Sequence, residues 1–378
     1  MRQKIAFVCN TAWGLYNFRR GIICSLLQQG VDVVVIAPRD KYSEKLGRLG
    51  CRFKEVQLQS RGMNPIQDLN FFLELYALYT TEKPHLIFHY TIKPNIYGSF
   101  AARLLAIPSV AVVTGAGQAF DRQNVLNRLV SMLYRIGLAK AVAVWFLNDD
   151  DKRLFISNGI TTEAQCSVIR SEGIDTTVFS PERFSRSSSM AVSFLMHGRL
   201  LWEKGVGEYV DAARALRERG MDAKFYLLGF LDSQNTSSVS ELQVRTWERE
   251  GVISYLGVSD NVGEQISQAD VVVLPSYYRE GVPRALLEAA ALEKPVITTN
   301  WAGCKDVVDD SVTGLLCQPK NASDLADKMY RLATMSATAR LEMGKAGRQK
   351  VLREFNEDSV IESYLNLIKR VRQRRLFQ

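Results

Sequence analysis

Short apolar runs recur along the first half of the chain at intervals typical of alternating strands and helices. Longer segments between them, such as residues 20–29 and 69–80, have helical periodicity. Apolar runs separated by helices are what a parallel sheet covered on both faces requires, so this half predicts a doubly wound α/β lobe. The runs that predict strands are residues 5–9, 31–37, 53–58, 86–88, 110–114 and 143–147.

The same pattern starts again after residues 184–189, a polar, serine-rich stretch that is typical of a linker. Helices are expected from Glu208, Pro283 and Ser323. Ligands of open α/β sheets bind at the carboxyl ends of the strands, so two lobes of this kind predict a cleft between them. The strands expected in the second lobe are residues 191–196, 225–228, 253–256, 271–274 and 295–299.

Composition favours a globular protein of two domains. A chain of 378 residues is too long for one ordinary core. Its apolar stretches, such as residues 136–147, are shorter than the 18 or so residues that span a bilayer, and the first strand follows the N-terminus too closely for a signal peptide, so we expect a cytoplasmic protein. The six cysteines form no CxxC pair and are expected to be reduced core residues.

The net charge of +8 is concentrated in the first half of the chain. Residues 1–180 hold 21 Lys and Arg against 14 Asp and Glu, which is +7, and residues 181–378 hold 27 against 26, which is +1. A basic lobe attracts nucleic acid, anionic lipid or a phosphorylated acceptor, and an ordinary solvated basic surface is the alternative.

The most informative segment, residues 275–289 (PSYYREGVPRALLEA), follows an expected strand. Gly281 permits a tight turn and Pro283 suits the first position of a helix. Glu280 is therefore expected in the turn and Glu288 about a turn and a half inside the helix. The helix N-terminus favours an anion such as a diphosphate, and carboxylates beside it can accept hydrogen bonds from sugar hydroxyls.

This segment resembles the E-x7-E element of glycosyltransferase family 4, whose members are retaining enzymes of the GT-B fold. The resemblance implies two Rossmann-like lobes, with Glu280 beside the transferred sugar and Glu288 on the nucleotide ribose. Residues 198–205 (GRLLWEKG) resemble the phosphate-binding element of the family, which implies that Arg199 and Lys204 contact the donor diphosphate. Two cations there would neutralise the charge that develops as the sugar–phosphate bond breaks.

Other matches to the family complete the expected site. Gly14 resembles the glycine that approaches the donor phosphate, Gly257 and Ser259 match the edge that holds the nucleobase, and Gly281 and Val282 join them as nucleotide-binding residues. The active-site histidine of the family aligns with Ile92. The sequence leaves open whether His89 or Lys93 replaces it, or whether His89 is a structural residue at a strand end.

Two further patterns resemble sites of other protein classes. Residues 114–120 (TGAGQAF) follow a strand like a dinucleotide-binding loop, but Phe120 stands where the third glycine belongs. Residues 148–151 (NDDD) contain a DxD string, which binds a divalent metal in another glycosyltransferase fold. Here it precedes a helical segment, and we interpret it as a helix cap with acids in the first turn.

The sequence thus predicts a GT-B hexosyltransferase that needs no metal or cofactor and moves a hexose or N-acetylhexosamine from UDP to an undecaprenyl-diphosphate-linked acceptor. The expected domains are residues 1–184 (acceptor), 185–355 (donor nucleotide) and 356–378, a helix that crosses back to the first lobe. Its tail (KRVRQRR, residues 369–375) suggests peripheral association with the anionic inner face of the cytoplasmic membrane. Alternatives are a nucleotide-sugar epimerase, a non-catalytic sugar-nucleotide-binding protein and an NAD-dependent oxidoreductase. The missing third glycine of residues 114–120 argues against the oxidoreductase.

Overall fold

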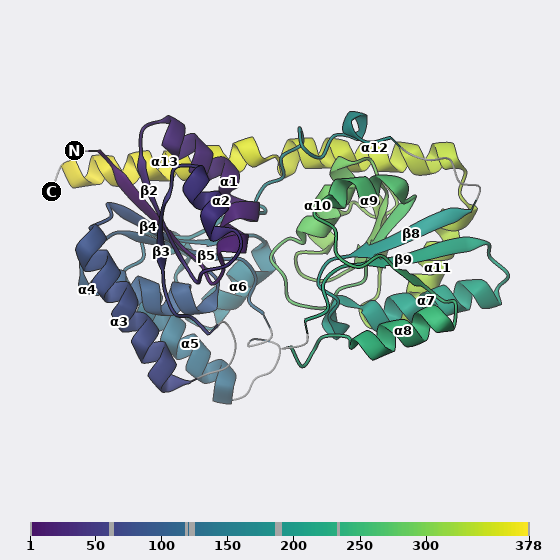
Figure 1. Cartoon of the computed structure of the whole chain (residues 1–378), viewed down its shortest axis with the longest axis horizontal. Coiled ribbons are helices and arrows are strands. Elements are labelled where there is room, and N and C mark those ends of the chain that lie inside the picture. Colours follow the sequence, from purple (N-terminus) through teal and green to yellow (C-terminus); the bar gives the residue numbers. More distant parts are fainter. Residues whose placement is uncertain are drawn as a thin grey trace. The chain divides into compact units, whose positions relative to one another are not determined.

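The chain folds into two α/β units, shown in Figure 1. The computed structural model describes residues 2–59, 64–117, 120, 125–185, 191–232 and 235–376, the side chains of 374–376 excepted. Unit 1 comprises Met1–Gly173 and Glu357–Gln378, and unit 2 comprises Ile174–Asn356.

Unit 1 contains a parallel sheet of seven strands in the order β3-β2-β1-β4-β5-β6-β7. The six strands predicted from apolar runs are present, with ends shifted by up to three residues. The sequence did not predict β7, which is short and only partly buried. The strands are β1 (Lys4–Val8), β2 (Asp32–Ala37), β3 (Arg52–Glu55), β4 (Leu86–Tyr90), β5 (Ser109–Val113), β6 (Ala143–Phe146) and β7 (Cys166–Val168).

Helices cover both faces of this sheet, as the buried strands require. Figure 1 shows α1, α2 and α13 on one side and α3, α4 and α5 on the other. A short π-helix, Pro94–Gly98, precedes α4. The helices are α1 (Ala12–Gln28), α2 (Ser43–Arg48), α3 (Pro65–Glu82), α4 (Ser99–Leu104), α5 (Val125–Leu138), α6 (Asp149–Ser157) and α13 (Glu357–Leu376).

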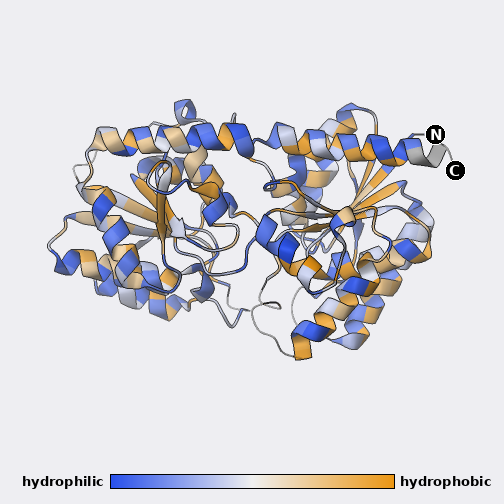
Figure 2. Ribbon diagram, turned by 180° about the vertical axis from the view of Figure 1, so that it is seen from behind, coloured by the Kyte–Doolittle hydropathy of each residue, from blue (hydrophilic) through white to orange (hydrophobic). Residues whose placement is uncertain are grey.

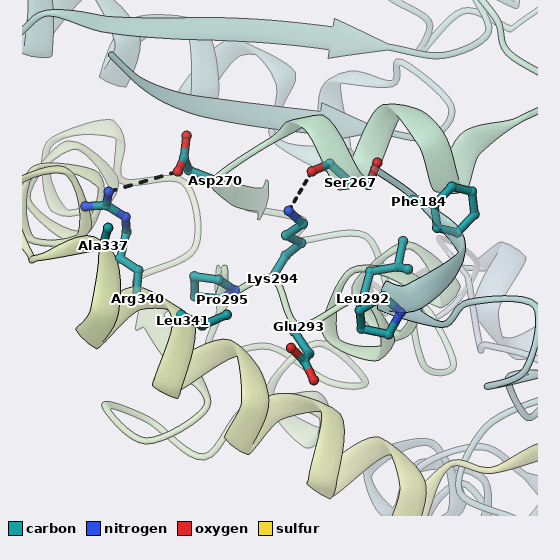
Figure 3. A pocket seen from close by; sticks show the side chains of 11 residues that line it. Phe184, Ser267, Asp270, Leu292, Glu293, Lys294, Pro295, Ala337, Arg340 and Leu341 are labelled. Atoms are coloured by element: carbon teal, nitrogen blue, oxygen red, sulfur yellow. Dashed lines mark hydrogen bonds and ion pairs between the residues drawn. The ribbon is translucent and has the colours of Figure 1, made fainter. Parts of the chain in front are cut away.

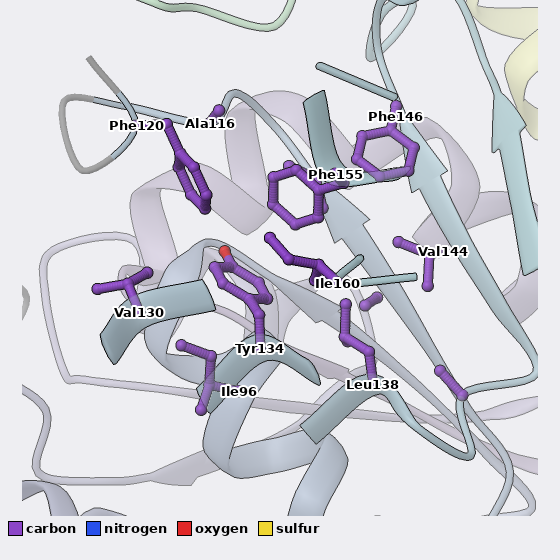
Figure 4. Packing of buried hydrophobic residues seen from close by; sticks show 13 residues of the cluster. Ile96, Ala116, Phe120, Val130, Tyr134, Leu138, Val144, Phe146, Phe155 and Ile160 are labelled. Carbon is purple, nitrogen blue, oxygen red and sulfur yellow. The ribbon is translucent and has the colours of Figure 1, made fainter. Parts of the chain in front are cut away.

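An aromatic cluster that includes side chains of α5 and α6 lies in the core of unit 1 (Figure 4). Phe155 lies 5.0 Å from Tyr134, 5.1 Å from Phe146 and 5.2 Å from Phe120, measured between ring centroids. Phe120, which stands where a dinucleotide-binding loop needs its third glycine, is therefore a core residue.

Unit 2 contains a parallel sheet of six strands in the order β10-β9-β8-β11-β12-β13. The five predicted strands are present, and β13 is an addition at the edge. The strands are β8 (Val192–His197), β9 (Ala223–Leu228), β10 (Ser254–Tyr255), β11 (Val271–Leu274), β12 (Val296–Thr299) and β13 (Gly314–Cys317).

The helices of unit 2 pack in pairs, with α7 against α11 and α10 against α12. The helices predicted from Glu208, Pro283 and Ser323 correspond to α7, α10 and α11, each within two residues of the expected start. The helices are α7 (Val206–Glu218), α8 (Glu241–Arg249), α9 (Val262–Gln268), α10 (Arg284–Ala291), α11 (Ala322–Thr334) and α12 (Ala337–Glu354). The α/β class predicted for both halves is confirmed.

The first domain ends at Gly173, whereas the sequence placed its end at residue 184. The backbone N–H of Ile174 donates to the carbonyl oxygen of Phe355 at 3.0 Å. Arg348 of α12 also donates to the carbonyl oxygen of Phe179, at 3.1 Å. These bonds tie residues 174–184 to unit 2, before the serine-rich stretch that was interpreted as the linker.

Candidate functional site

Two loops at the carboxyl edge of the unit 2 sheet are fastened to each other. One follows β8 and contains Lys204, and the other follows the neighbouring strand β11 and contains Glu280. The carbonyl oxygen of Glu203 accepts hydrogen bonds from the backbone N–H groups of both Tyr277 and Tyr278, each at 2.9 Å. Residues that are more than 70 positions apart in sequence therefore share one rigid backbone junction.

Gly205 allows this close approach. Its φ of +81° lies in the left-handed region, and a Cβ at this position would lie 2.3 Å from the carbonyl oxygen of Pro275. Any side chain would force the loops apart. The glycine that ends the GRLLWEKG segment is thus a requirement of the junction.

The junction brings Lys204 and Glu280 together. Lys204 Nζ lies 3.1 Å from Glu280 Oε2, and Ser276 Oγ donates to Glu280 Oε1 at 2.9 Å. Both charged side chains are largely buried, with 10% and 14% of their surface exposed. Each carboxylate oxygen of Glu280 therefore has a fixed partner, which holds the acid in one orientation.

The segment after β12 packs against the loop that contains Glu280. Gly303 has a φ of +78°, and a Cβ there would lie 1.8 Å from the carbonyl oxygen of Gly281. Cys304 is buried next to it, and burial, with Glu280 as a further contribution, raises the pKa of its thiol to about 12. Val282 is also buried, so its side chain belongs to the core and its backbone would have to make any contact with a nucleotide.

Glu288 lies on the second turn of α10. The helix begins at Arg284 with Pro283 as its N-cap, one residue later than the sequence indicated. Arg284 Nε donates to Glu288 Oε1 at 2.9 Å, an i,i+4 ion pair that is mostly buried. His197 at the end of β8 bonds through Nε2 to the carbonyl oxygen of Ala285 at 3.2 Å, which ties the end of this strand to the first turn of α10.

Arg199 lies in the same loop as Lys204 and is exposed. Within the part of the chain that the structure describes, no group lies at ion-pair distance from its guanidinium. This side chain can therefore reorient toward an anion without breaking an existing contact.

Three glycines mark the ends of three adjacent strands in this unit. Gly198, Gly229 and Gly257 follow β8, β9 and β10, and all have φ between +72° and +153°. The N–H of Gly229 donates to the carbonyl oxygen of Gly257 at 2.7 Å, and a Cβ on Gly229 would lie 1.7 Å from the carbonyl oxygen of Gly198. Beside them, Ser259 Oγ accepts from the backbone of Asn261 at 3.0 Å. The glycines therefore let the backbone segments that follow these three strands approach one another closely.

Gly14 in unit 1 lies in the first turn of α1 and not in a free loop. Thr11 caps the helix, and its Oγ1 accepts the N–H of Gly14 at 3.0 Å. The adjacent N–H of Trp13 donates to Asp40 Oδ2 at 2.8 Å. The contact expected between Gly14 and a phosphate stays a prediction, and it would have to compete with this cap.

His89 belongs to the core of unit 1. It is fully buried, its Nε2 lies 2.9 Å from the hydroxyl of Tyr79, and its Nδ1 lies 3.2 Å from the hydroxyl of Ser99. Burial lowers its pKa to about 3, so the ring is neutral at physiological pH. Of the roles that the sequence left open, this geometry favours the structural one and excludes direct contact with a substrate in this conformation.

Lys93 follows β4 at the carboxyl edge of the unit 1 sheet. Its Nζ lies 2.7 Å from Asp68 Oδ1, and both side chains are largely buried. Ile92, which takes the position of the family histidine, packs against the aromatic cluster of Figure 4. Because His89 is buried and neutral, Lys93 is the cation of residues 89–95 that could bind an acceptor. To do so, its ammonium group would have to leave Asp68.

The DxD string forms the start of α6, as the sequence suggested. Asn148 is the N-cap, and its Oδ1 accepts the N–H of Asp151 at 2.8 Å. Asp151 is fully buried and accepts the N–H of Ala116 at 3.2 Å. The aspartates thus close a helix end and fix the loop after β5.

A surface pocket of about 190 Å³ lies elsewhere on unit 2 (Figure 3). Asp270 and Pro295, which line it, precede β11 and β12, so it lies at the amino edge of the sheet. Figure 3 shows two of its contacts: Arg340 lies 4.0 Å from Asp270 Oδ1, and Lys294 Nζ donates to the carbonyl oxygen of Ser267 at 2.6 Å. None of the predicted site residues lies there.

Sequence reasoning missed several residues that build the carboxyl edge. Ser276 was noted only as part of a motif, although its hydroxyl orients Glu280. Gly229 and Gly303 were not singled out, although each follows a strand, which was the available signal. The carbonyl of Glu203 gives no signal in a sequence, because its partners lie in another loop.

Comparison with known proteins places this geometry in a family. The glycosyl transferase 4-like model matches residues 4–148, and the glycosyl transferases group 1 model matches residues 182–350. The chain is 29% identical to the N,N'-diacetylbacillosaminyl-diphospho-undecaprenol alpha-1,3-N-acetylgalactosaminyltransferase of Campylobacter jejuni, over 98% of this chain and 99% of the relative.

Two further comparisons agree. The UDP-Gal:alpha-D-GlcNAc-diphosphoundecaprenol alpha-1,3-galactosyltransferase of Escherichia coli is 26% identical, over 82% of each chain. A glycosyltransferase from Rickettsia africae has the same fold, with a TM-score of 0.80 over 98% of each chain and 18% identity. The 4-like model over the first half and the group 1 model over the second half assign the chain to the glycosyl transferases, the class of enzyme that the E-x7-E element indicated.

Proposed function

We propose that this glycosyltransferase moves a hexose or N-acetylhexosamine from a UDP-sugar to an undecaprenyl-diphosphate-linked saccharide, with retention of anomeric configuration, during the assembly of a surface polysaccharide or glycan. The observation that carries the proposal is the buried pair of Lys204 and Glu280, held at the carboxyl edge of the unit 2 sheet by Glu203 and Ser276. Cleavage of a sugar–diphosphate bond develops negative charge on the diphosphate and positive charge on the sugar. An anchored cation can stabilise the first charge and an anchored carboxylate the second.

Lys204 is suited to the donor diphosphate. An ammonium group has three N–H donors, and the bond to Glu280 uses one, so two can donate to phosphate oxygens. Arg199, exposed in the same loop, supplies a second cation that can fold over the diphosphate. Together they would stabilise the negative charge of the leaving group, and these protein cations take the part that a metal plays in other transferases. We therefore propose that no metal is required.

The proposed reaction breaks the bond between the anomeric carbon and the diphosphate oxygen, and a hydroxyl oxygen of the acceptor forms the new bond to that carbon. The hydroxyl proton leaves with the diphosphate. Positive charge develops on the sugar ring, and the carboxylate of Glu280 is proposed to lie beside it and to hold a sugar hydroxyl. Glu288 is proposed to accept a hydrogen bond from the ribose.

The relatives support the choice of donor, acceptor and stereochemistry. The names of both relatives describe acceptors on diphosphate-linked undecaprenol, and the second names a UDP-sugar donor. Both names also specify an alpha linkage, which is the product that retention gives from an alpha-configured UDP-sugar. An acceptor of this kind is anchored in lipid, so we also propose peripheral association with the inner face of the cytoplasmic membrane.

The relatives give no support to the epimerase or to the non-catalytic alternative, since each is named as a transferase. Mass spectrometry of the products from a panel of UDP-sugars, incubated with undecaprenyl-diphosphate-linked acceptors, tests the proposal. It predicts a lipid product heavier by one sugar residue and release of UDP. A changed nucleotide sugar with no lipid product would indicate an epimerase instead.

A further inference from the structure

Two helices of unit 1 carry large apolar side chains on their exposed faces. On α3 these are Ile66, Leu69, Leu73 and Tyr76, at spacings of three and four residues. On α5 the same spacings recur in a second set. Residues three and four apart lie on the same side of a helix, so each set forms one stripe. The second set is Val125, Leu129, Met132 and Ile136, with Leu126 beside it.

These stripes are additional to the faces that α3 and α5 already bury. Phe71, Leu75 and Tyr79 of α3 point into the core of unit 1, and Tyr134 and Leu138 of α5 do the same. A helix that is apolar on both its core side and its outer side needs a second apolar environment. Val125 is 82% exposed and Ile66 is 72% exposed, so nothing in the described chain provides it.

The two stripes belong to one surface. Helix α4 contacts both α3 and α5, and its Leu104 is exposed as well. Figure 1 shows the first turns of α3 and α5 at the same end of the unit, and Figure 2 shows orange segments on the outside of these helices. We call this surface, formed by the outer sides of α3, α4 and α5, the α3–α5 face.

The exposed charges of α4, of α5 and of the turn after α5 are positive. Residues 99–105 and 125–140 contain no Asp or Glu, and four exposed cations lie among them. On α3, the acids Asp68 and Glu82 are buried in ion pairs with lysines, which leaves the partly exposed Glu74. The four cations are Arg103, Arg128, Arg135 and Lys140.

We propose that the α3–α5 face docks on an anionic lipid bilayer. Apolar stripes flanked by Arg and Lys fit the boundary between acyl chains and headgroups, where long cationic side chains reach the phosphates. No helix of the described chain is long and apolar enough to span a bilayer, so this docking is peripheral. A second protein would be an equally apolar partner, but it would leave the four exposed cations of α4, of α5 and of the turn after α5, with no exposed acid among them, unexplained.

The location of this face matches the needs of a lipid-linked acceptor, and here the inference rests on the proposed function. Helix α3 follows β3, so its first turn lies at the carboxyl edge of the sheet, where α/β proteins bind ligands. The C-terminal tail lies elsewhere. Helix α13 packs against α1 on the other side of the sheet, and Figure 1 shows both termini together, away from the first turns of α3 and α5. The basic tail and the α3–α5 face are therefore alternative lipid-binding sites.

Vesicle flotation with the full chain separates them. We expect binding to vesicles that contain phosphatidylglycerol, and at least tenfold weaker binding for the double variant Leu129→Gln/Met132→Gln. The matched control is Leu242→Gln/Leu341→Gln, which removes two exposed leucines from helices of unit 2. This control and the tail variant Arg372→Gln/Arg374→Gln/Arg375→Gln should bind within about twofold of the parent.

Three outcomes would overturn the proposal. The first is unchanged vesicle binding by Leu129→Gln/Met132→Gln, and the second is loss of binding in the tail variant alone. The third is a dimer, detected by sedimentation velocity, that the Leu129→Gln/Met132→Gln change dissociates. Transfer to a detergent-dispersed acceptor should persist in this double variant. If even the parent chain shows no transfer, the proposed function fails while the vesicle result still stands.

Discussion

Lys204 Nζ and Glu280 Oε2 lie 3.1 Å apart, although 76 positions separate the two residues in the chain. Their loops are joined by the carbonyl of Glu203 and by the contact of Gly205 with Pro275, so the pair is set by backbone geometry. An enzyme that must act on both ends of a sugar–diphosphate bond needs a cation and an acid at a fixed separation. The pair of Lys204 and Glu280 has this property, and the predictions below follow from it.

The variants Lys204→Ala and Arg199→Ala are each expected to lower the turnover number by on the order of 100-fold, because each removes a positioned cation from the developing diphosphate charge. UDP release at saturating donor measures the turnover number. Lys224→Ala, which removes an exposed cation from β9, should leave it unchanged. A mild effect in both loop variants would indicate a protein that binds sugar nucleotides without cleaving them.

Glu288→Ala is expected to weaken UDP binding by about 1–3 kcal/mol, the cost of losing a largely buried hydrogen bond to a charged group. That corresponds to an increase in Kd of roughly 5- to 150-fold, measurable by calorimetry. Arg284→Ala serves as the control, since it removes the ion-pair partner and leaves the carboxylate available. Equal losses in both variants would mean that Glu288 only stabilises α10.

Transfer activity is expected to persist in excess EDTA, because protein cations are proposed to do the work of a metal. Asp149→Asn, which removes the exposed acid of the DxD string from the first turn of α6 without touching the buried Asp151, should also remain active. A strict requirement for manganese or magnesium, together with loss of transfer activity in Asp149→Asn, would restore the metal interpretation of Asp149 and Asp151.

The buried His89 predicts a loss of stability in acid. Its pKa falls to about 3 in the folded chain, below the ordinary value near 6.5, so the unfolded chain binds the proton first as the pH drops. The contribution of neutral His89 to the free energy of unfolding is complete above pH 6.5 and decreases progressively toward pH 3. Between pH 7 and pH 5 the free energy of unfolding is expected to fall by on the order of 2 kcal/mol. Chemical denaturation at both pH values measures this change.

His89→Gln supplies the comparison for that measurement. Glutamine can bond to the hydroxyls of Tyr79 and Ser99 but does not titrate, so the variant is expected to be less stable at pH 7 and less sensitive to acid. An identical pH dependence in the parent and the variant would contradict the assignment of His89 as a buried neutral residue.

The sequence predicted the fold well because the strands are buried on both sides. Runs such as residues 110–113 and 271–274 consist of apolar residues, and these positions are fully buried in β5 and β11. The prediction missed β7, whose three residues are partly exposed and leave no apolar run. The end of the first domain was also missed, because a hydrogen bond between Ile174 and Phe355 sets it over a long sequence separation.

The candidate site was predictable where chemistry and local pattern coincide. Glu280 and Glu288 could be placed from a strand end, a glycine and a proline within one segment. The location of His89 could not be predicted from the sequence, because a histidine after an apolar run gives the same pattern whether it faces a ligand or the core. Only the fold brings the hydroxyls of Tyr79 and Ser99 to its two ring nitrogens.

The most direct test of the central claim is the transfer rate of Glu280→Gln, followed by mass spectrometry of the lipid product, together with calorimetry of UDP binding to the same variant. Glu218→Gln, an exposed acid of α7, is the matched control. Because the proposed partner of Glu280 is the sugar and not the nucleotide, the account predicts that transfer is abolished while UDP affinity stays within a few-fold of the parent. Full transfer activity in Glu280→Gln would contradict it.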